Sequence, residues 1–156
     1  MEPIENKNSE INYTNTTLIS ADIKAVYKAI ILDIDKWWST TKGKANEIGS
    51  EFKIEFGGES YWKFEVVNLI EKKQIVWKCI ESNQDHNIQG IDEEWLNSIV
   101  TWKLSKNEEG TKVSFLHDGL QPSGVCYDVC SRAWDFYLFD SLKNYLETGK
   151  GNPNGM

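Results

Sequence analysis

The feature that most constrains this chain is a series of short alternating segments followed by one long amphipathic stretch. Apolar and polar residues alternate through 52–56, 62–66, 100–104 and 113–117, which is the period of half-buried strands. Residues 75–80 also predict a strand, but apolar residues occur on both of its parities, so it is expected to be covered on part of both faces. Polar turns separate these segments, so consecutive strands are expected to pair antiparallel. This arrangement excludes a doubly wound parallel sheet, which needs a helix between its strands. A sheet of this kind has an apolar face that another element must cover.

Residues 124–148 are predicted to form the helix that covers the apolar face of this sheet. At the helical step of about 100° per residue, one broad and mostly apolar side holds Cys126, Cys130, Ala133, Trp134, Tyr137, Leu138, Ser141, Leu142 and Tyr145. Gly149 is a candidate for the residue that ends this helix. Val129, Phe136 and Phe139 lie within or at the edge of the polar side, where they could meet the N-terminal segment, a loop or a second subunit.

The N-terminal part predicts one further strand and two helices. Residues 11–19 favour a strand, and Ser20 is a candidate N-cap. Apolar residues then recur at three- and four-residue spacing from Ile23 to Ile31, which predicts a helix. A second short helix is expected at 33–38, followed by a loop at 39–49. The fold is therefore expected to be α+β, a curved antiparallel sheet of six or seven strands around a long C-terminal helix.

Length and charge narrow the class of protein. The 156 residues fit one domain, predicted at 10–153 after a polar tail at 1–9. The chain carries a net charge of −7 and a single arginine, Arg132, which disfavours nucleic-acid binding. No apolar run approaches the roughly 18 residues of a membrane span, and the N-terminus lacks the apolar core of a signal peptide. We therefore expect a cytoplasmic protein.

The sequence gives no strong indication of a metal or another cofactor, and none is expected. The three cysteines, Cys79, Cys126 and Cys130, are expected to be buried thiols, because their spacing is unlike that of common zinc sites. Residues 85–96 partly imitate a calcium loop, but Leu96 stands where a bidentate glutamate is required. We expect a mobile loop there, over the mouth of a cavity, with Trp95 as its anchor.

Three stretches together resemble a known family. They are ISADIKAVYKAI followed by DKWW, SIVTWKLSKNEEGTKVSFLHDGL, and Trp134 followed by SLKNYLETGKGNP. The chain resembles the START/Bet v 1-like (SRPBCC) superfamily, and within it the activator of heat-shock-protein-90 ATPase (AHSA-type) proteins. The resemblance implies a helix-grip fold with a deep internal cavity. Relatives include ligand carriers, polyketide cyclases, stress-response proteins and a co-chaperone domain, so the resemblance does not fix one function.

A ligand site is expected where aromatic side chains line the space between the long helix and the sheet. Its predicted lining is Trp38, Trp62, Phe64, Trp77, Trp102, Phe115, His117, Trp134, Tyr137 and Leu138. The alternative is that these residues simply pack the core. His117 shares the inward parity of Val113 and Phe115, so it is either a general acid or base or a neutral, hydrogen-bonded histidine near the end of the sheet.

Three functions follow as hypotheses. The first is a binding protein for a small hydrophobic or aromatic molecule. The second is an enzyme of the cyclase or hydratase type, in which His117 or Tyr137 moves protons. The third is a co-chaperone-like interaction domain, for which a chaperone partner is expected less strongly. A homodimer is a further expectation.

Overall fold

The computed structural model describes residues 12–56, 60–83, 95–121 and 127–153. Predictions for the N-terminal tail, the Gly57–Gly58 turn, Cys126 and residues 84–94 lie outside these ranges. The strands are β1 (Tyr13–Ile19), β2 (Thr40–Gly43), β3 (Glu51–Glu55), β4 (Tyr61–Ile70), β5 (Gln74–Asn83), β6 (Ile99–Asn107) and β7 (Gly110–Asp118). The helices are α1 (Ile23–Leu32), α2 (Ile34–Trp37), α4 (Tyr127–Asp135), η1 (Phe136–Leu142) and α5 (Lys143–Thr148).

The strands form one antiparallel sheet in the order β1-β7-β6-β5-β4-β3-β2. The first strand pairs with the last, with Tyr13 opposite His117. All other neighbours in the sheet are consecutive in sequence, as the alternating segments predicted. The prediction of a loop at 39–49 is wrong for β2. This strand has no buried residue, so it lacks the apolar alternation that marks the others.

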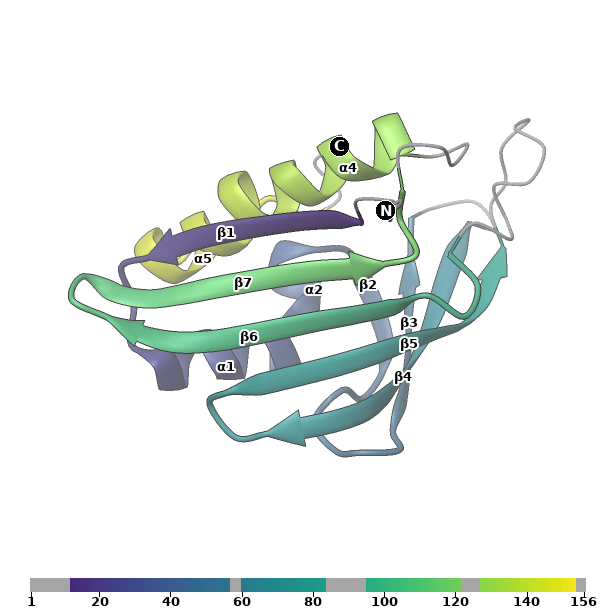
Figure 1. Ribbon diagram of the computed structural model, residues 1–156, viewed down its shortest axis with the longest axis horizontal. Helices are drawn as coiled ribbons and strands as arrows, with labels where there is room; N and C mark the ends of the chain where they lie inside the picture. Colours follow the sequence, from purple (N-terminus) through teal and green to yellow (C-terminus); the bar gives the residue numbers. More distant parts are fainter. Residues whose placement is uncertain (1–11, 57–59, 84–94, 122–126, 154–156) are drawn as a thin grey trace, which may run out of the picture.

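The sheet curves around the helices. Figure 1 shows β6 and β7 in front of α1 and α2, while β2 and β3 lie behind α2. The pairing of β4 with β5 has register shifts at Lys63/Phe64 and at Val66/Asn68, and such irregularities increase strand bending and twist. Inward residues of β4 and β5 are buried, whereas their neighbours on the outer face are half-buried or exposed. The concave face is therefore the core face.

Helices α1 and α2 occupy part of the concave side. The spacing from Ile23 to Ile31 predicted α1 correctly, but its N-cap is Asp22 and not Ser20. The backbone N–H of Ser20 instead donates to Glu147 on α5, at 2.7 Å. The Trp37 indole N–H donates to the carbonyl of Ala29 at 2.9 Å, which holds α2 against the end of α1.

The predicted C-terminal helix extends from Tyr127 to Thr148 in the described residues, and its middle part, η1, is a π-helix. The sequence predicted no such change. Ser141 in η1 donates to the carbonyl of Trp37 and accepts the backbone N–H of Asn152, which fixes the helix against α2. Gly149 adopts a left-handed conformation, with φ of 86°, and confirms the predicted helix end.

Side-chain bonds fasten the C-terminal helix to β1, which lies beside it in Figure 1. The Tyr13 hydroxyl donates to Asp135, and burial together with this bond raises the pKa of Tyr13. The Lys143 ammonium donates to the carbonyl of Leu18 at 2.5 Å. The helix is therefore held along one edge of the sheet as well as by apolar packing.

Candidate functional site

All ten side chains predicted to line a ligand site lie in the buried core between the helices and the sheet. Nine of these residues are at most 2% exposed, and Trp62 is 9% exposed. The inward parity of the strands and the apolar side of the long helix bring them together, as the sequence predicted. Their burial alone is equally what a packed core requires.

Stacked and edge-on rings connect the cluster. Trp38 lies at its centre, with its ring centroid 4.8 Å from that of Trp134 and 6.1 Å from that of Trp77. Trp77 is 5.5 Å from Trp102, which is 4.7 Å from Phe115. These separations are those of rings in direct contact. A guest molecule would have to move some of these rings apart.

Trp95 belongs to the same cluster, although it was predicted only as the anchor of a loop. Its ring stacks on Trp62 with centroids 3.7 Å apart, and it lies 5.8 Å from Trp134. The residue is 3% exposed. No periodicity marks it, because Trp95 precedes β6 rather than lying on a strand. Its size and apolar ring were the signals that could have placed it in the core.

His117 is held at both ring nitrogens. The indole N–H of Trp134 donates to Nδ1 at 3.1 Å, so the ring proton lies on Nε2. That N–H donates to the Ser98 hydroxyl at 2.8 Å, which in turn donates to the carbonyl of Trp95 at 2.5 Å. Burial lowers the pKa of His117 to about 3. The ring is therefore neutral near pH 7, with no nitrogen available for proton transfer in this arrangement.

Four other indole N–H groups have no such partner. Among the described residues, the Nε1 atoms of Trp62, Trp77, Trp95 and Trp102 are buried without a hydrogen-bond acceptor, and the hydroxyl of Ser82 is buried without a partner. Ser82 is directly opposite Trp62 in the β4–β5 register, so these two groups occupy the same face of the sheet. Leaving a buried donor unpaired costs about 1–3 kcal/mol. The cluster therefore offers several unsatisfied donors in an apolar wall.

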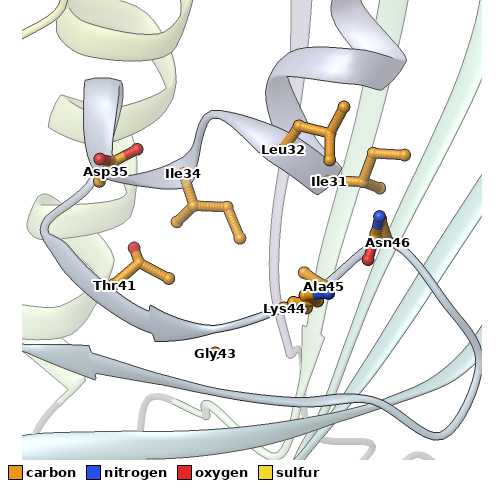
Figure 2. A pocket seen from close by; sticks show the side chains of 9 residues that line it. All are labelled: Ile31, Leu32, Ile34, Asp35, Thr41, Gly43, Lys44, Ala45 and Asn46. Atoms are coloured by element: carbon orange, nitrogen blue, oxygen red, sulfur yellow. The ribbon is translucent and has the colours of Figure 1, made fainter.

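Among the pockets lined by described residues, two lie outside this cluster and a third shares only Phe115 with it. One, of about 300 Å³, lies between the end of α1 and the chain that follows β2. Figure 2 shows Ile31 and Leu32 of α1 on one side of it and Ala45 on the other. None of the ten predicted residues lines it. A second pocket, of about 840 Å³, is near the turn between β4 and β5. A third is lined by residues of β1, β6 and β7, and Phe115 is one of them.

Of the two described cysteines, one matches expectation and one does not. Cys79 is free and buried, and burial raises the pKa of its thiol to about 12. Cys130 is in a disulfide, so the prediction of a free thiol is wrong there. Within the described ranges, no three His, Cys, Asp or Glu side chains come together as a metal site. No helix in that part of the chain is long and apolar enough to cross a membrane.

Comparison with known proteins adds the family context. The family described as activator of Hsp90 ATPase homolog 1-like protein matches residues 20–147. Comparison with curated protein sequences gives no significant match. The matched range contains every element from α1 to η1, and all of the ten predicted site residues.

Solved structures share the architecture. The Aha1 dimer from Colwellia psychrerythraea is 28% identical, with a TM-score of 0.73 over 90% of this chain and 99% of that one. Protein MLL2253 from Mesorhizobium loti is 20% identical, with a TM-score of 0.67 over 82% of this chain and 91% of that one. DynU16, from the dynemicin biosynthetic locus, is 17% identical, with a TM-score of 0.68 over 88% of this chain and 48% of that one. The last two similarities concern the fold alone.

Proposed function

This chain belongs to the family of activator of Hsp90 ATPase homolog 1-like proteins, and on that premise we propose that it binds a small apolar molecule among its interior aromatic rings. The ligand is aromatic or otherwise flat, and it carries at least one hydrogen-bond acceptor such as a carbonyl or ether oxygen. Apolar contact with the rings supplies affinity, and the unpartnered indole donors orient the guest.

The unpartnered donors are the single observation that carries this proposal. Trp77 and Trp102 are 0% exposed, yet neither indole N–H has an acceptor. Nearly all buried polar groups in proteins are paired, and each exception requires an explanation. A guest with an acceptor would supply the missing partner and recover the cost of the unpaired N–H. A purely hydrocarbon guest would not.

Trp62 indicates the side at which a guest approaches. At 9% it is the most exposed of the predicted site residues, and its ring covers Trp95. Separating these two stacked rings would open a slot between their faces for a flat guest, and an acceptor at the edge of that guest could meet the in-plane indole N–H groups, which are unpartnered among the described residues. The guest would then replace one ring-to-ring contact with two ring-to-guest contacts.

Two probes that differ only in an acceptor test the proposal. The first is 2-acetylnaphthalene, and the second is 2-ethylnaphthalene, which has nearly the same shape but no oxygen. We expect the acetyl compound to quench tryptophan emission at about one equivalent. It should bind about threefold to tenfold more tightly than the ethyl compound, the worth of one hydrogen bond. Equal affinities, or no saturable binding of either compound, would contradict the proposal.

A matched pair of variants locates the site. Trp102→Phe removes an unpartnered indole N–H, whereas Trp37→Phe removes an indole N–H that already donates to the carbonyl of Ala29. Both rings are 0% exposed, and their centroids lie 5.7 Å apart. We expect the first variant to reduce the preference for the acetyl compound and the second to retain it. Thermal melting of both variants checks that each is folded at the titration temperature.

The other predicted roles remain predictions. The enzymatic hypothesis named His117 or Tyr137 as the group that moves protons. Both nitrogens of His117 are already bonded, so a proton-transfer role for this residue would need a rearranged site. A homodimer is supported by the dimeric Aha1 relative, and sedimentation velocity at several protein concentrations would test it. Binding to a chaperone and a cytoplasmic location are still expectations from the sequence.

A further inference from the structure

A surface pocket near the β4–β5 turn has a charge opposite to that of the whole chain. It has a volume of about 840 Å³, and five lysines line it: Lys24, Lys72, Lys73, Lys103 and Lys106. Asp22 and Glu71 are the acidic residues of its lining, so the formal charge of the lining is about +3. The chain as a whole carries −7.

These lysines have no carboxylate partner. Within the described ranges, the salt bridges join Lys63 to Glu51 and Lys143 to Glu147, and neither involves the pocket. All five pocket lysines are exposed. Surface lysines on an acidic protein usually have many neighbouring carboxylates with which to pair. Here five lysines outnumber two carboxylates, Asp22 and Glu71, and this excess produces a local positive potential that attracts an anionic partner and orients its approach.

The pocket also has an apolar component. Ile70 is 46% exposed at its rim, and Leu104 is buried beneath at 6%. The backbone around them is fixed, because the N–H of Leu104 donates to the carbonyl of Lys73 at 2.8 Å and that of Lys73 to Ile70 at 2.9 Å. An exposed isoleucine among lysines favours a partner that has both negative charge and an apolar side chain.

The lining disfavours nucleotides and nucleic acids as the partner. It includes no aromatic ring to stack on a base and no arginine to grip a phosphate with two bonds; these are the usual means of recognition. An acidic peptide requires neither, because ammonium groups act on carboxylates as point charges. Its apolar side chain would contact Ile70.

We propose that this pocket docks an acidic protein segment that carries one apolar side chain. The inference does not depend on ligand binding in the aromatic interior, because the pocket includes none of the rings of that cluster. The lysines supply attraction and orientation, and Ile70 supplies the contact that selects one segment among many acidic ones.

Fluorescence anisotropy with two labelled peptides tests the proposal. One short peptide of Asp, Glu and Ser carries a central leucine, and the other has serine in its place. We expect saturable binding of the leucine peptide that weakens as salt rises to about 0.15 M, where the Debye length falls to about 8 Å. The serine peptide should bind several-fold more weakly.

Paired charge reversals assign the binding to the pocket. We expect Lys73→Glu/Lys103→Glu to weaken binding of the leucine peptide by about tenfold or more. Lys42→Glu/Lys150→Glu makes the same change in net charge at exposed lysines that do not line the pocket, and it should have a much smaller effect. Equal weakening in both variants, or equal binding of both peptides, would overturn the proposal. So would lysine-dependent binding of phosphatidylserine vesicles without binding of the peptide.

Discussion

His117 lies between Ser98 and Trp134, and both of its ring nitrogens are hydrogen-bonded. Protonation would place an N–H at Nδ1, directly facing the indole N–H of Trp134. The charged ring would therefore lose the bond from Trp134, and the two N–H groups would repel each other. Burial alone already lowers the pKa of His117 to about 3. The network therefore requires a neutral ring with the proton on Nε2, which makes this residue sensitive to acid.

The first prediction concerns stability against pH. The unfolded chain binds a proton at this histidine below its ordinary pKa of about 6.5, whereas the folded chain binds it only near pH 3. The contribution of this group to the free energy of unfolding is therefore complete above about pH 6.5, and it falls as the pH drops from about 6.5 towards 3. The loss approaches about 1.4 kcal/mol per pH unit, or about 2 kcal/mol by pH 5.

Urea unfolding of the native protein and of His117→Gln at pH 7.5, 6 and 5 measures this difference. Carboxylates titrate in both proteins, so the quantity of interest is the gap between the two curves. We expect the native protein to lose its advantage over the variant as the pH falls. Parallel curves would show that His117 is not the acid-sensitive group.

The sequence predicted where His117 points but not what it touches. Strand parity gave its inward direction, since Val113 and Phe115 share that parity and are buried. Its partners come from separate parts of the chain, the segment before β6 and the helix α4. Neither Ser98 nor Trp95 lies on a periodic element, so no local pattern could connect them to His117.

At the scale of elements, the β6–β7 hairpin packs closely against the chain between β1 and α1. Gly110 has φ of +143°, and a Cβ there would lie 2.1 Å from the carbonyl oxygen of Ile19 and 2.9 Å from the nitrogen of Ala21. Both obstacles are backbone atoms, which cannot rotate away. Only glycine fits this position.

The second prediction is that Gly110→Ala lowers the free energy of unfolding by at least about 3 kcal/mol, through backbone strain and the clash together. Gly49→Ala is the matched control. Gly49 also has a positive φ, +92°, but a Cβ there meets nothing within 4 Å. We expect this control to lose only about 1 kcal/mol. Equal losses in denaturant unfolding would mean that the hairpin can move away from β1.

One buried hydroxyl in η1 connects this helix to two other segments of the chain. Ser141 is 0% exposed, and it links the carbonyl of Trp37 to the backbone N–H of Asn152. The third prediction is that Ser141→Ala costs about 1–3 kcal/mol, because it removes both of these bonds and leaves the backbone N–H of Asn152 unpaired. Ser131→Ala, which removes a 3.4 Å bond on the exposed side of α4, should cost less than about 0.5 kcal/mol. Chemical denaturation compares the two, and similar costs would contradict this role.

Elements with a clear apolar period were predictable, and elements held by other contacts were not. The strands around Phe52 and Val100 alternate, and the strand around Trp77 is a mostly apolar run between polar segments, so their sequence alone located them. Strand β2 is held by backbone pairing with β3, and its exposed side chains carry no such signal. The change to a π-helix at Phe136 leaves the apolar side of the helix in place, so a helical period does not reveal it.

At the scale of the whole molecule, the curved sheet and the helices enclose an interior made mostly of aromatic rings. The predicted antiparallel sheet of six or seven strands is confirmed, and so is its cover by the C-terminal helix, whereas the pairing of the first strand with the last was not predicted. The sequence could place the rings inside by parity. It could not show which indole N–H groups would find acceptors, since those come from segments far apart in the chain.

This distinction separates two groups of tryptophans. The indole N–H of Trp37 and that of Trp134 are bonded within the protein, whereas those of Trp62, Trp77, Trp95 and Trp102 are unpartnered. A simple packed core gives no reason for the second group. A binding site for acceptor-bearing guests does, and the two explanations differ in what happens to these N–H groups when a guest is added.

The most direct measurement is the ¹H–¹⁵N spectrum of the indole groups during titration with 2-acetylnaphthalene, with resonances assigned by single Trp→Phe variants. We predict a downfield shift for at least one unpartnered N–H. The Trp37 and Trp134 resonances should move little, and 2-ethylnaphthalene should not reproduce the shift. Binding of the probe that leaves all four unpartnered resonances in place would contradict the account.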